Sequence, residues 1–429
     1  MKALQLLLSL SFSFLMLLSN AAETDTIPAE DDAGKAFSFR WTGFVKTDYW
    51  IDSRTVVAAR EDLFLLFPAH AKPDANGKDI HGDPVFNFSA ITSRLATHIA
   101  GPDAFGAKVT GFIEADFSGV TNADINGFRL RHAYMKLQWE RWGLMLGQWW
   151  HPMFATAVVP TVVSLNTGAP FQPFIRNPQA TLTYDHGHSR WLFSAIAQRD
   201  NASDGPDGPS PAYIRNATLP NVHLQWYRTK DGFTAGLAAD YKVIRPRTQL
   251  SIYDPTETYY TSTTLGTYAF MAYGRYHLDK LDIKAKTIYG QNLSEHLMMG
   301  GYAESFSIEN GVYEYTPLNH LAAWANVLYG DRVLAGLFFG YGKNLGASSY
   351  VKADGENGKA PVTYYGRGHD IAYLYRVAPS LTFNSGRLAF CTELEYTAAA
   401  YGTPDAKGSV QDHTETGNWR LLFTALYFF

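Results

Sequence analysis

Sixteen segments of the chain alternate apolar and polar side chains, and this repeated period of two constrains the fold more than any other feature. Successive side chains of a β-strand point to opposite faces, so each segment predicts a strand with one apolar face. The segments are 37–51, 85–99, 106–118, 127–139, 142–150, 176–185, 188–199, 218–229, 231–243, 262–278, 280–293, 317–329, 331–343, 364–378, 386–398 and 418–429. Most exceed the roughly 9–11 residues that a tilted strand needs to cross a bilayer.

The connections between these segments alternate strictly between long and short. The long ones are 52–84, 119–126, 151–175, 200–217, 244–261, 294–316, 344–363 and 399–417; the short ones are 100–105, 140–141, 186–187, 230, 279, 330 and 379–385. Tight turns on one side and long loops on the other are typical of transmembrane barrels, with the turns periplasmic. We therefore predict an all-β fold, a closed antiparallel barrel of about 16 strands, because lipid offers no partner to an open sheet edge.

The last segment, residues 418–429, has the clearest pattern. Trp419, Leu421, Phe423 and Tyr427 share an apolar face, and Arg420 lies on the other. The segment ends with the aromatic residue Phe429. The C-terminal targeting signal by which outer-membrane proteins reach their assembly machinery also ends with an aromatic residue. We expect Phe429 to make that contact.

Composition agrees with a membrane barrel rather than a helical membrane protein. Mean hydropathy is −0.17, yet the chain holds 26 Tyr, 27 Phe and 10 Trp. Alternating lipid-facing and lumen-facing residues keep mean hydropathy near zero, and aromatic residues gather at both membrane surfaces. After residue 22 no stretch approaches the 18 apolar residues of a spanning helix.

The N-terminal residues predict export. Lys2 precedes an apolar run over residues 3–18, and small residues including Ser19 and Ala21 follow it. This is the pattern of a cleaved signal peptide. We expect a signal peptide over 1–21, a short periplasmic segment over 22–36, and the barrel over 37–429, in the outer membrane of a Gram-negative-type envelope.

Residues 84–185 resemble the trimeric porin superfamily, especially the DcaP-like porins. The matching pieces are ITSRLATHI (91–99), GFIEADF (111–117), FRLRHAYMKL (128–137), GLMLGQWWHPMF (143–154) and FQPFIRNPQ (171–179). The resemblance implies a homotrimer and passive uptake of small solutes, with organic anions such as dicarboxylates as the associated class. A helical N-terminal extension, found in some members, is not expected, because few residues precede the barrel.

The connection 151–175 is the candidate constriction. It is apolar, with four prolines and no Asp, Glu, Lys or Arg. Such a loop is poorly suited to water, so we expect it to fold inward and narrow the lumen. The alternative is that it caps the rim or contacts another subunit. Phe171, Phe174 and the adjoining Arg176 are its candidate pore residues.

Charged residues on neighbouring strands form the candidate filter. The alternation places Arg94, Arg129 and Arg131 on one inner face, with Glu114 and Asp116 on the strand between them. Guanidinium groups in such a position can grip carboxylates in bidentate fashion. The alternative is an ion-pair lattice that braces the wall. Lys and Arg also outnumber Asp and Glu on the presumed inner face, which predicts a modest preference for anions.

Other functions find little support in the sequence. No G-x-S-x-G nucleophile elbow occurs, so we expect no enzyme and no catalytic residues. Cys391 is the only cysteine, and the pair His186 and His188 lacks further ligands, so we expect no metal and no cofactor. The expected partners are outer-membrane lipid and small solutes, and not nucleic acid. A sugar channel lined by Trp149, Trp150, Phe171 and Phe174, or a plugged barrel with a structural or adhesive role, remains an alternative.

Overall fold

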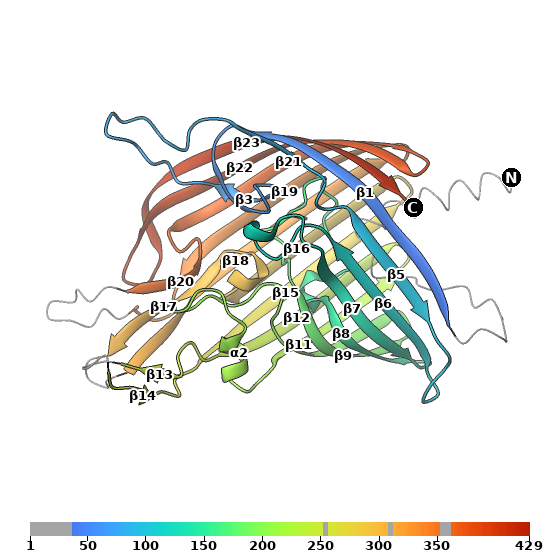
Figure 1. The fold of residues 1–429 in the computed structure, drawn as a ribbon, viewed down its shortest axis with the longest axis horizontal. Coiled ribbons are helices and arrows are strands. Elements are labelled where there is room, and N and C mark those ends of the chain that lie inside the picture. The colour runs from blue at the N-terminus through green and yellow to red at the C-terminus, as the bar shows by residue number, and fades with distance from the viewer. Residues whose placement is uncertain (1–36, 252–255, 308–311, 352–361) are drawn as a thin grey trace.

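A computed structural model describes residues 37–251, 256–307, 312–351 and 362–429 (Figure 1). The expected signal peptide over 1–21 and the segment 22–36 lie outside these residues. None of the helices among the described residues is long and apolar enough to span a membrane.

The structure consists mainly of strands. They are β1 (Ser38–Asp52), β2 (Val56–Ala59), β3 (Phe64–Pro68), β4 (Val85–Ser89), β5 (Arg94–Ala100), β6 (Lys108–Asp116), β7 (Arg129–Gln138), β8 (Trp142–Trp150), β9 (Arg176–His186), β10 (Ser189–Ile196), β11 (Asn221–Lys230), β12 (Phe233–Ile244), β13 (Gln249–Leu250), β14 (Tyr259–Tyr260), β15 (Leu265–Leu278), β16 (Leu281–Gln291), β17 (Gly300–Ser307), β18 (Val312–Gly330), β19 (Val333–Gly346), β20 (Thr363–Arg367), β21 (Ile371–Ser385), β22 (Leu388–Pro404) and β23 (Val410–Phe428). The helices are α2 (Ala212–Asn216) and the 3₁₀ turns η1 (Asn122–Asp124), η2 (Pro152–Phe154) and η3 (Ser294–His296).

Sixteen antiparallel strands close into a barrel, as the sequence predicts. The ring runs β1, β4 with β5, β6, β7, β8, β9, β10, β11, β12, β15, β16, β18, β19, β21, β22 and β23. β1 closes it, because Phe44 pairs with Phe428 of β23 on one side and with Arg94 of β5 on the other. The described sheet thus has no open edge in the ring, as a lipid environment requires.

Alternation of burial along β23 confirms the predicted faces. Arg420, Leu422, Thr424 and Leu426 are at most 2% exposed, whereas Trp419, Leu421, Phe423 and Tyr427 are 42–53% exposed. The second set points outward. Similar outward residues on the other strands give the barrel an apolar outer surface, of the kind that faces lipid.

Several predicted connections differ from the structure, and the one at 294–316 contains β17 and the first residues of β18. β22 runs to Pro404 and β23 begins at Val410, so the long connection predicted at 399–417 is a tight turn at the tip of an extended hairpin. The short connection predicted at 379–385 belongs to β21. At 379–385 and at 399–417 cross-strand pairing continues past the predicted strand ends.

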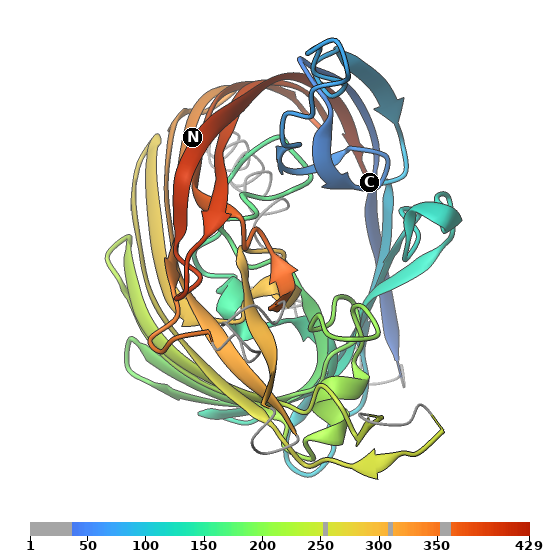
Figure 2. The same ribbon diagram turned by 90° about the vertical axis from the view of Figure 1, so that its left-hand side faces the viewer.

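The lumen holds two inward segments. Figure 2 looks into the end that carries the long connections and places residues 151–175 inside the ring. The β2–β3 hairpin also lies inside, with every residue from Leu63 to Phe67 at most 4% exposed. Both segments contribute to one large core cluster with Met271, Trp324 and Phe338 of the wall. The inward position of 151–175 agrees with the sequence; that of the hairpin was not predicted.

Candidate functional site

The predicted charged residues of β5, β6 and β7 meet on the inner wall. Arg131 donates from Nε to Glu114 Oε1 at 2.6 Å and from Nη1 to Asp116 Oδ2 at 2.8 Å. Arg129 grips Asp116 in bidentate fashion, with Nε–Oδ1 at 2.8 Å and Nη2–Oδ2 at 3.2 Å. A bulge beside Glu114 leaves Arg131 without a pairing partner across the ladder, so Arg131 and its neighbour His132 both turn inward.

Arg176 joins this cluster through a residue that the sequence did not single out. Its Nη2 lies 2.6 Å from Asp200 Oδ2, and Asp200 Oδ1 lies 3.6 Å from Arg129 Nη1. Burial alone would raise the pKa of Asp200, but the charges of Arg176 and Arg129 hold this pKa below its ordinary value. No signal marked Asp200 beforehand, because it opens a stretch rich in turn residues.

Arg94 is the loosest member of the cluster. Its Nη1 lies 3.6 Å from Glu114 Oε2, its Nε has no hydrogen-bond partner in the described part of the chain, and its side chain is 20% exposed. Its guanidinium stands 5.0 Å from the ring centroid of Phe44. We call this group the Arg94 cluster. It consists of four arginines (Arg94, Arg129, Arg131, Arg176) and three carboxylates (Glu114, Asp116, Asp200), which leaves a surplus of one positive charge.

The two candidate phenylalanines lie apart. Phe174 sits beside the cluster, with the Arg176 guanidinium 5.4 Å from its ring and Trp150 packed edge-on at 5.0 Å. Phe171 is 1% exposed and packs against Phe338 and the guanidinium of Arg376 on a different part of the wall. Phe171 is therefore not brought together with the charged group of Arg94, Arg129 and Arg131. Trp150, Phe171 and Phe174 are buried, and Trp149 is half-buried against Phe112, His132 and Tyr134, which leaves little open aromatic face for a sugar slide.

Wall charges hold the inward loop through its backbone. Lys286 donates to the carbonyl of Phe154 at 2.6 Å, and Arg376 donates to the carbonyl of Ala169 at 2.7 Å. Glu393 accepts from the amides of Val163 and Ser164 at 2.8 and 3.1 Å. An apolar loop buried in a polar lumen must satisfy its peptide groups, and these charges do so.

This arrangement changes the expected charge count of the lumen. Lys286 and Arg376 are at most 3% exposed, so the loop covers them. Arg420 is covered as well, because it donates to the carbonyls of Asp62 and Leu63 at the hairpin and pairs with Asp52 at 2.6 Å. Many of the positive charges counted on the inner face thus anchor loops, and the surplus at the Arg94 cluster is what lies near open space.

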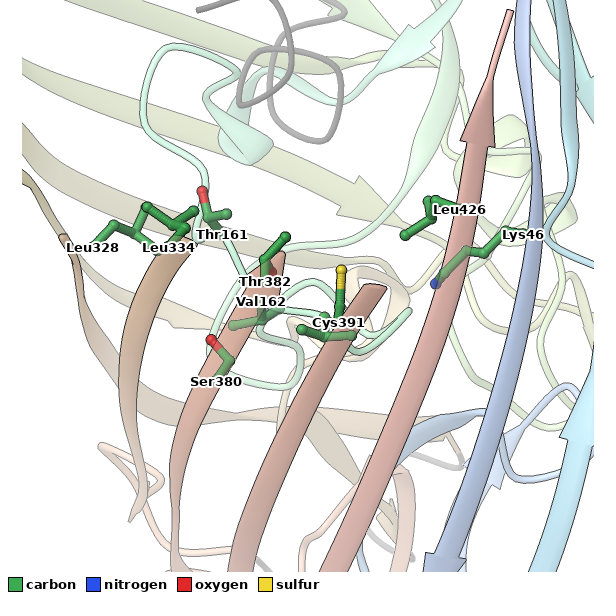
Figure 3. Close-up of a pocket in the computed structure, with 10 residues that line it drawn as sticks. Lys46, Thr161, Val162, Leu328, Leu334, Ser380, Thr382, Cys391 and Leu426 are labelled. Carbon is green, nitrogen blue, oxygen red and sulfur yellow. The ribbon is translucent and has the colours of Figure 1, made fainter. Parts of the chain in front are cut away.

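Two pockets flank the loop segment 161–163. The larger has an empty volume of about 830 Å³ and is lined by Phe44, Lys46, Thr92, Arg94, Glu114, Arg131, His132, Trp150, Phe154, Thr156, Pro160, Val162, Val163, Ser164, Leu165, Thr167 and Phe174. The smaller, about 390 Å³, lies among strand residues such as Leu328, Thr382 and Cys391 (Figure 3). Lys46, Val162 and Val163 line both, so the two pockets adjoin at the loop.

A buried group on the wall has the residue types of a metal site. One ligand atom each from His151, His223 and Asp240 lie within 4.8 Å of one another. However, the Met153 amide donates to His151 Nδ1, so the ring proton sits on Nε2, which donates to Asn221 Oδ1 at 2.9 Å. The His151 lone pair is therefore already used, and the group is better described as a hydrogen-bonded network.

Comparison with solved structures places the fold. No family model matches the sequence, and no curated protein matches it either. The outer-membrane channel DcaP of Acinetobacter baumannii is 15% identical with a TM-score of 0.64, covering 92% of this chain and 98% of its own. An anion-selective porin from Comamonas acidovorans is 11% identical with a TM-score of 0.53, covering 92% and 100%. OmpF of Salmonella typhi, in complex with daunomycin, is 9% identical with a TM-score of 0.51, covering 92% and 98%. The chain therefore has the fold of the outer-membrane porins, and specifically a DcaP-like porin fold.

Proposed function

We propose that this protein is a passive diffusion channel of the outer membrane for small hydrophilic solutes, with a preference for organic anions. The observation that carries the proposal is the surplus positive charge of the Arg94 cluster, which faces a loop without a single Asp, Glu, Lys or Arg. A fixed charge at a narrow point of low dielectric selects ions by sign. No charge on the loop offsets it.

The solved structures support the same class of function. One is described as an outer-membrane channel and another as an anion-selective porin. Together with the absence of a nucleophile elbow, this favours a channel over an enzyme. Dicarboxylates, which the family resemblance implies, are one candidate solute class.

The zero-current potential of Arg94→Gln tests the role of the cluster. Refolded protein in a planar bilayer under a KCl gradient should favour chloride, and the variant should lose most of that preference because the surplus charge disappears. Arg387→Gln, at an exposed turn, is the matched control and should behave as the parent protein. A parent channel that favours potassium would overturn the proposal.

A plugged barrel is the second candidate, because two inward segments rather than one occupy the lumen. The β2–β3 hairpin and residues 151–175 touch each other, with Asn166 donating to the carbonyl of Leu65 at 3.0 Å. Liposome swelling separates the two functions. Swelling in small solutes supports a diffusion channel, whereas well-inserted protein that gives no swelling supports a plug with a structural or adhesive role.

Assembly and export belong to the same proposal. We infer a homotrimer, as one similar structure is described as a trimer form, and expect chemical cross-linking in detergent to give a three-chain species. We also infer that residues 1–21 are removed and that Phe429 engages the barrel assembly machinery. N-terminal sequencing of the membrane-inserted protein should begin at Ala22, and deletion of Phe429 should lower its yield in the outer membrane.

A further inference from the structure

The larger pocket has two unlike walls. The barrel side carries charged groups, among them Lys46, Arg94 and Glu114, whereas the loop side carries no charged group and presents mainly aliphatic and aromatic side chains, with the hydroxyls of Thr156, Ser164 and Thr167 among them. The half-buried residues of the loop side are Val162, Val163 and Leu165, together with Thr156 and Thr167. A solute that fits both walls must itself have a polar end and an apolar body.

The barrel side offers one loosely held cation. Arg131 is saturated by Glu114 and Asp116, and Lys46 pairs with the buried Asp48 at 3.1 Å. Among the described residues, the buried Nε of Arg94 has no hydrogen-bond partner, and the one ion pair of this side chain is the long contact from Nη1 to Glu114 at 3.6 Å. A guanidinium in this state can accept one carboxylate without breaking a short ion pair.

The loop side offers no second polar anchor of matching charge. Trp150 of β8 and Phe154 of the loop, which both line the pocket, stack in parallel with ring centroids 4.0 Å apart. A second carboxylate turned toward this side would lose water without gaining a cation, which is unfavourable. A hydrocarbon or aromatic body would instead remove apolar surface from water.

We propose that the pocket recognises monocarboxylates with an apolar body, with the carboxylate on Arg94 and the body against Val162 and its neighbours. This inference rests on the proposed channel function and narrows its solute class from organic anions in general. It disfavours compact anions, which cannot use the loop side. It also disfavours dicarboxylates, which would place one head there.

Block of the chloride current tests the solute class. Acetate, benzoate and succinate are added in turn at constant chloride, and the half-blocking concentration of each is measured. Benzoate should block at about tenfold lower concentration than acetate, because its ring buries apolar surface against the loop. Succinate should block no better than acetate. Equal block by acetate and benzoate, or strongest block by succinate, would overturn the proposal while leaving an anion channel intact.

Two variants locate the effect. Val162→Thr keeps the side-chain shape but adds a hydroxyl, so it should lower the ratio of the acetate to the benzoate half-blocking concentration severalfold. Val120→Thr makes the same change on an exposed residue outside the pocket and should leave the ratio as it is. An unchanged ratio in Val162→Thr contradicts the assignment of the loop side. A parent protein that shows no anion preference would instead refute the channel proposal on which this inference rests.

Discussion

Replacing Arg376 by methionine removes a side chain that holds both inward segments to the wall. Its Nη1 donates to the carbonyl of Ala169 at 2.7 Å, and its Nη2 donates to the carbonyl of Leu66 at 2.9 Å. Both acceptors belong to residues that are at most 3% exposed. Methionine fills much of the same volume but leaves two buried carbonyls without their donor.

The magnitude follows from these two bonds. A hydrogen bond to a charged group contributes about 1.5–3 kcal/mol, so losing both should weaken the anchoring by about 3–6 kcal/mol. Glu395, 3.2 Å from Arg376 Nε, also loses its cation. One of the two bonds holds the loop and the other holds the hairpin, and each 1.4 kcal/mol is roughly a tenfold change in population. The population of the detached loop should therefore rise by about one to two orders of magnitude.

Single-channel recording and limited proteolysis detect this change. Arg376→Met should give noisier current with additional conductance levels, and proteinase K should cut within residues 151–175 while the barrel persists. Arg387→Met, at an exposed turn, is the control and should resemble the parent protein. If Arg376→Met shows the noise and protease resistance of the parent, the backbone-anchoring argument is wrong.

Three further predictions concern the cluster, the packing of the loop and pH. Glu114→Gln removes one carboxylate beside Arg131, so the anion-to-cation permeability ratio should rise by roughly two- to threefold in a bilayer recording; an unchanged ratio would contradict the proposed filter. Gly340→Ala would place a Cβ 2.3 Å from Phe171, so guanidinium unfolding should show a loss of about 1–3 kcal/mol, whereas unaltered stability would mean that the ring moves freely. Burial lowers the pKa of His151 to about 4, so the unfolded chain binds more protons than the folded chain in this pH range. The free energy of unfolding should therefore fall as pH drops from 6.5 toward 4. His151→Gln should flatten this pH dependence, and an equal pH dependence in the variant would exclude His151 as its source.

Strand positions were predictable because lipid and lumen impose opposite polarities on alternate residues. β8 spans the predicted residues 142–150, and the ring has the predicted sixteen strands. Strand ends were less predictable, since β22 and β23 continue into a hairpin tip where the alternation of burial is lost.

The site was predictable only where strand register brings residues together. Asp116 of β6 pairs directly with Arg129 of β7, so alternation and register together place these two side chains in contact. Asp200 and the β2–β3 hairpin reach the lumen through long connections, whose paths no local pattern encodes. Phe171 was assigned to the pore by its position in an inward loop, but an inward loop has two sides, and Phe171 lies on the one that packs on the wall.

The zero-current potential of the unmodified protein under a KCl gradient is the most direct test of the central claim. We expect current steps from open channels and a zero-current potential with the sign of a chloride-preferring channel, because the positive charge at Arg94 is uncompensated. Inserted protein that gives no steps, or a potential of the sign set by potassium, would contradict an anion-preferring diffusion channel.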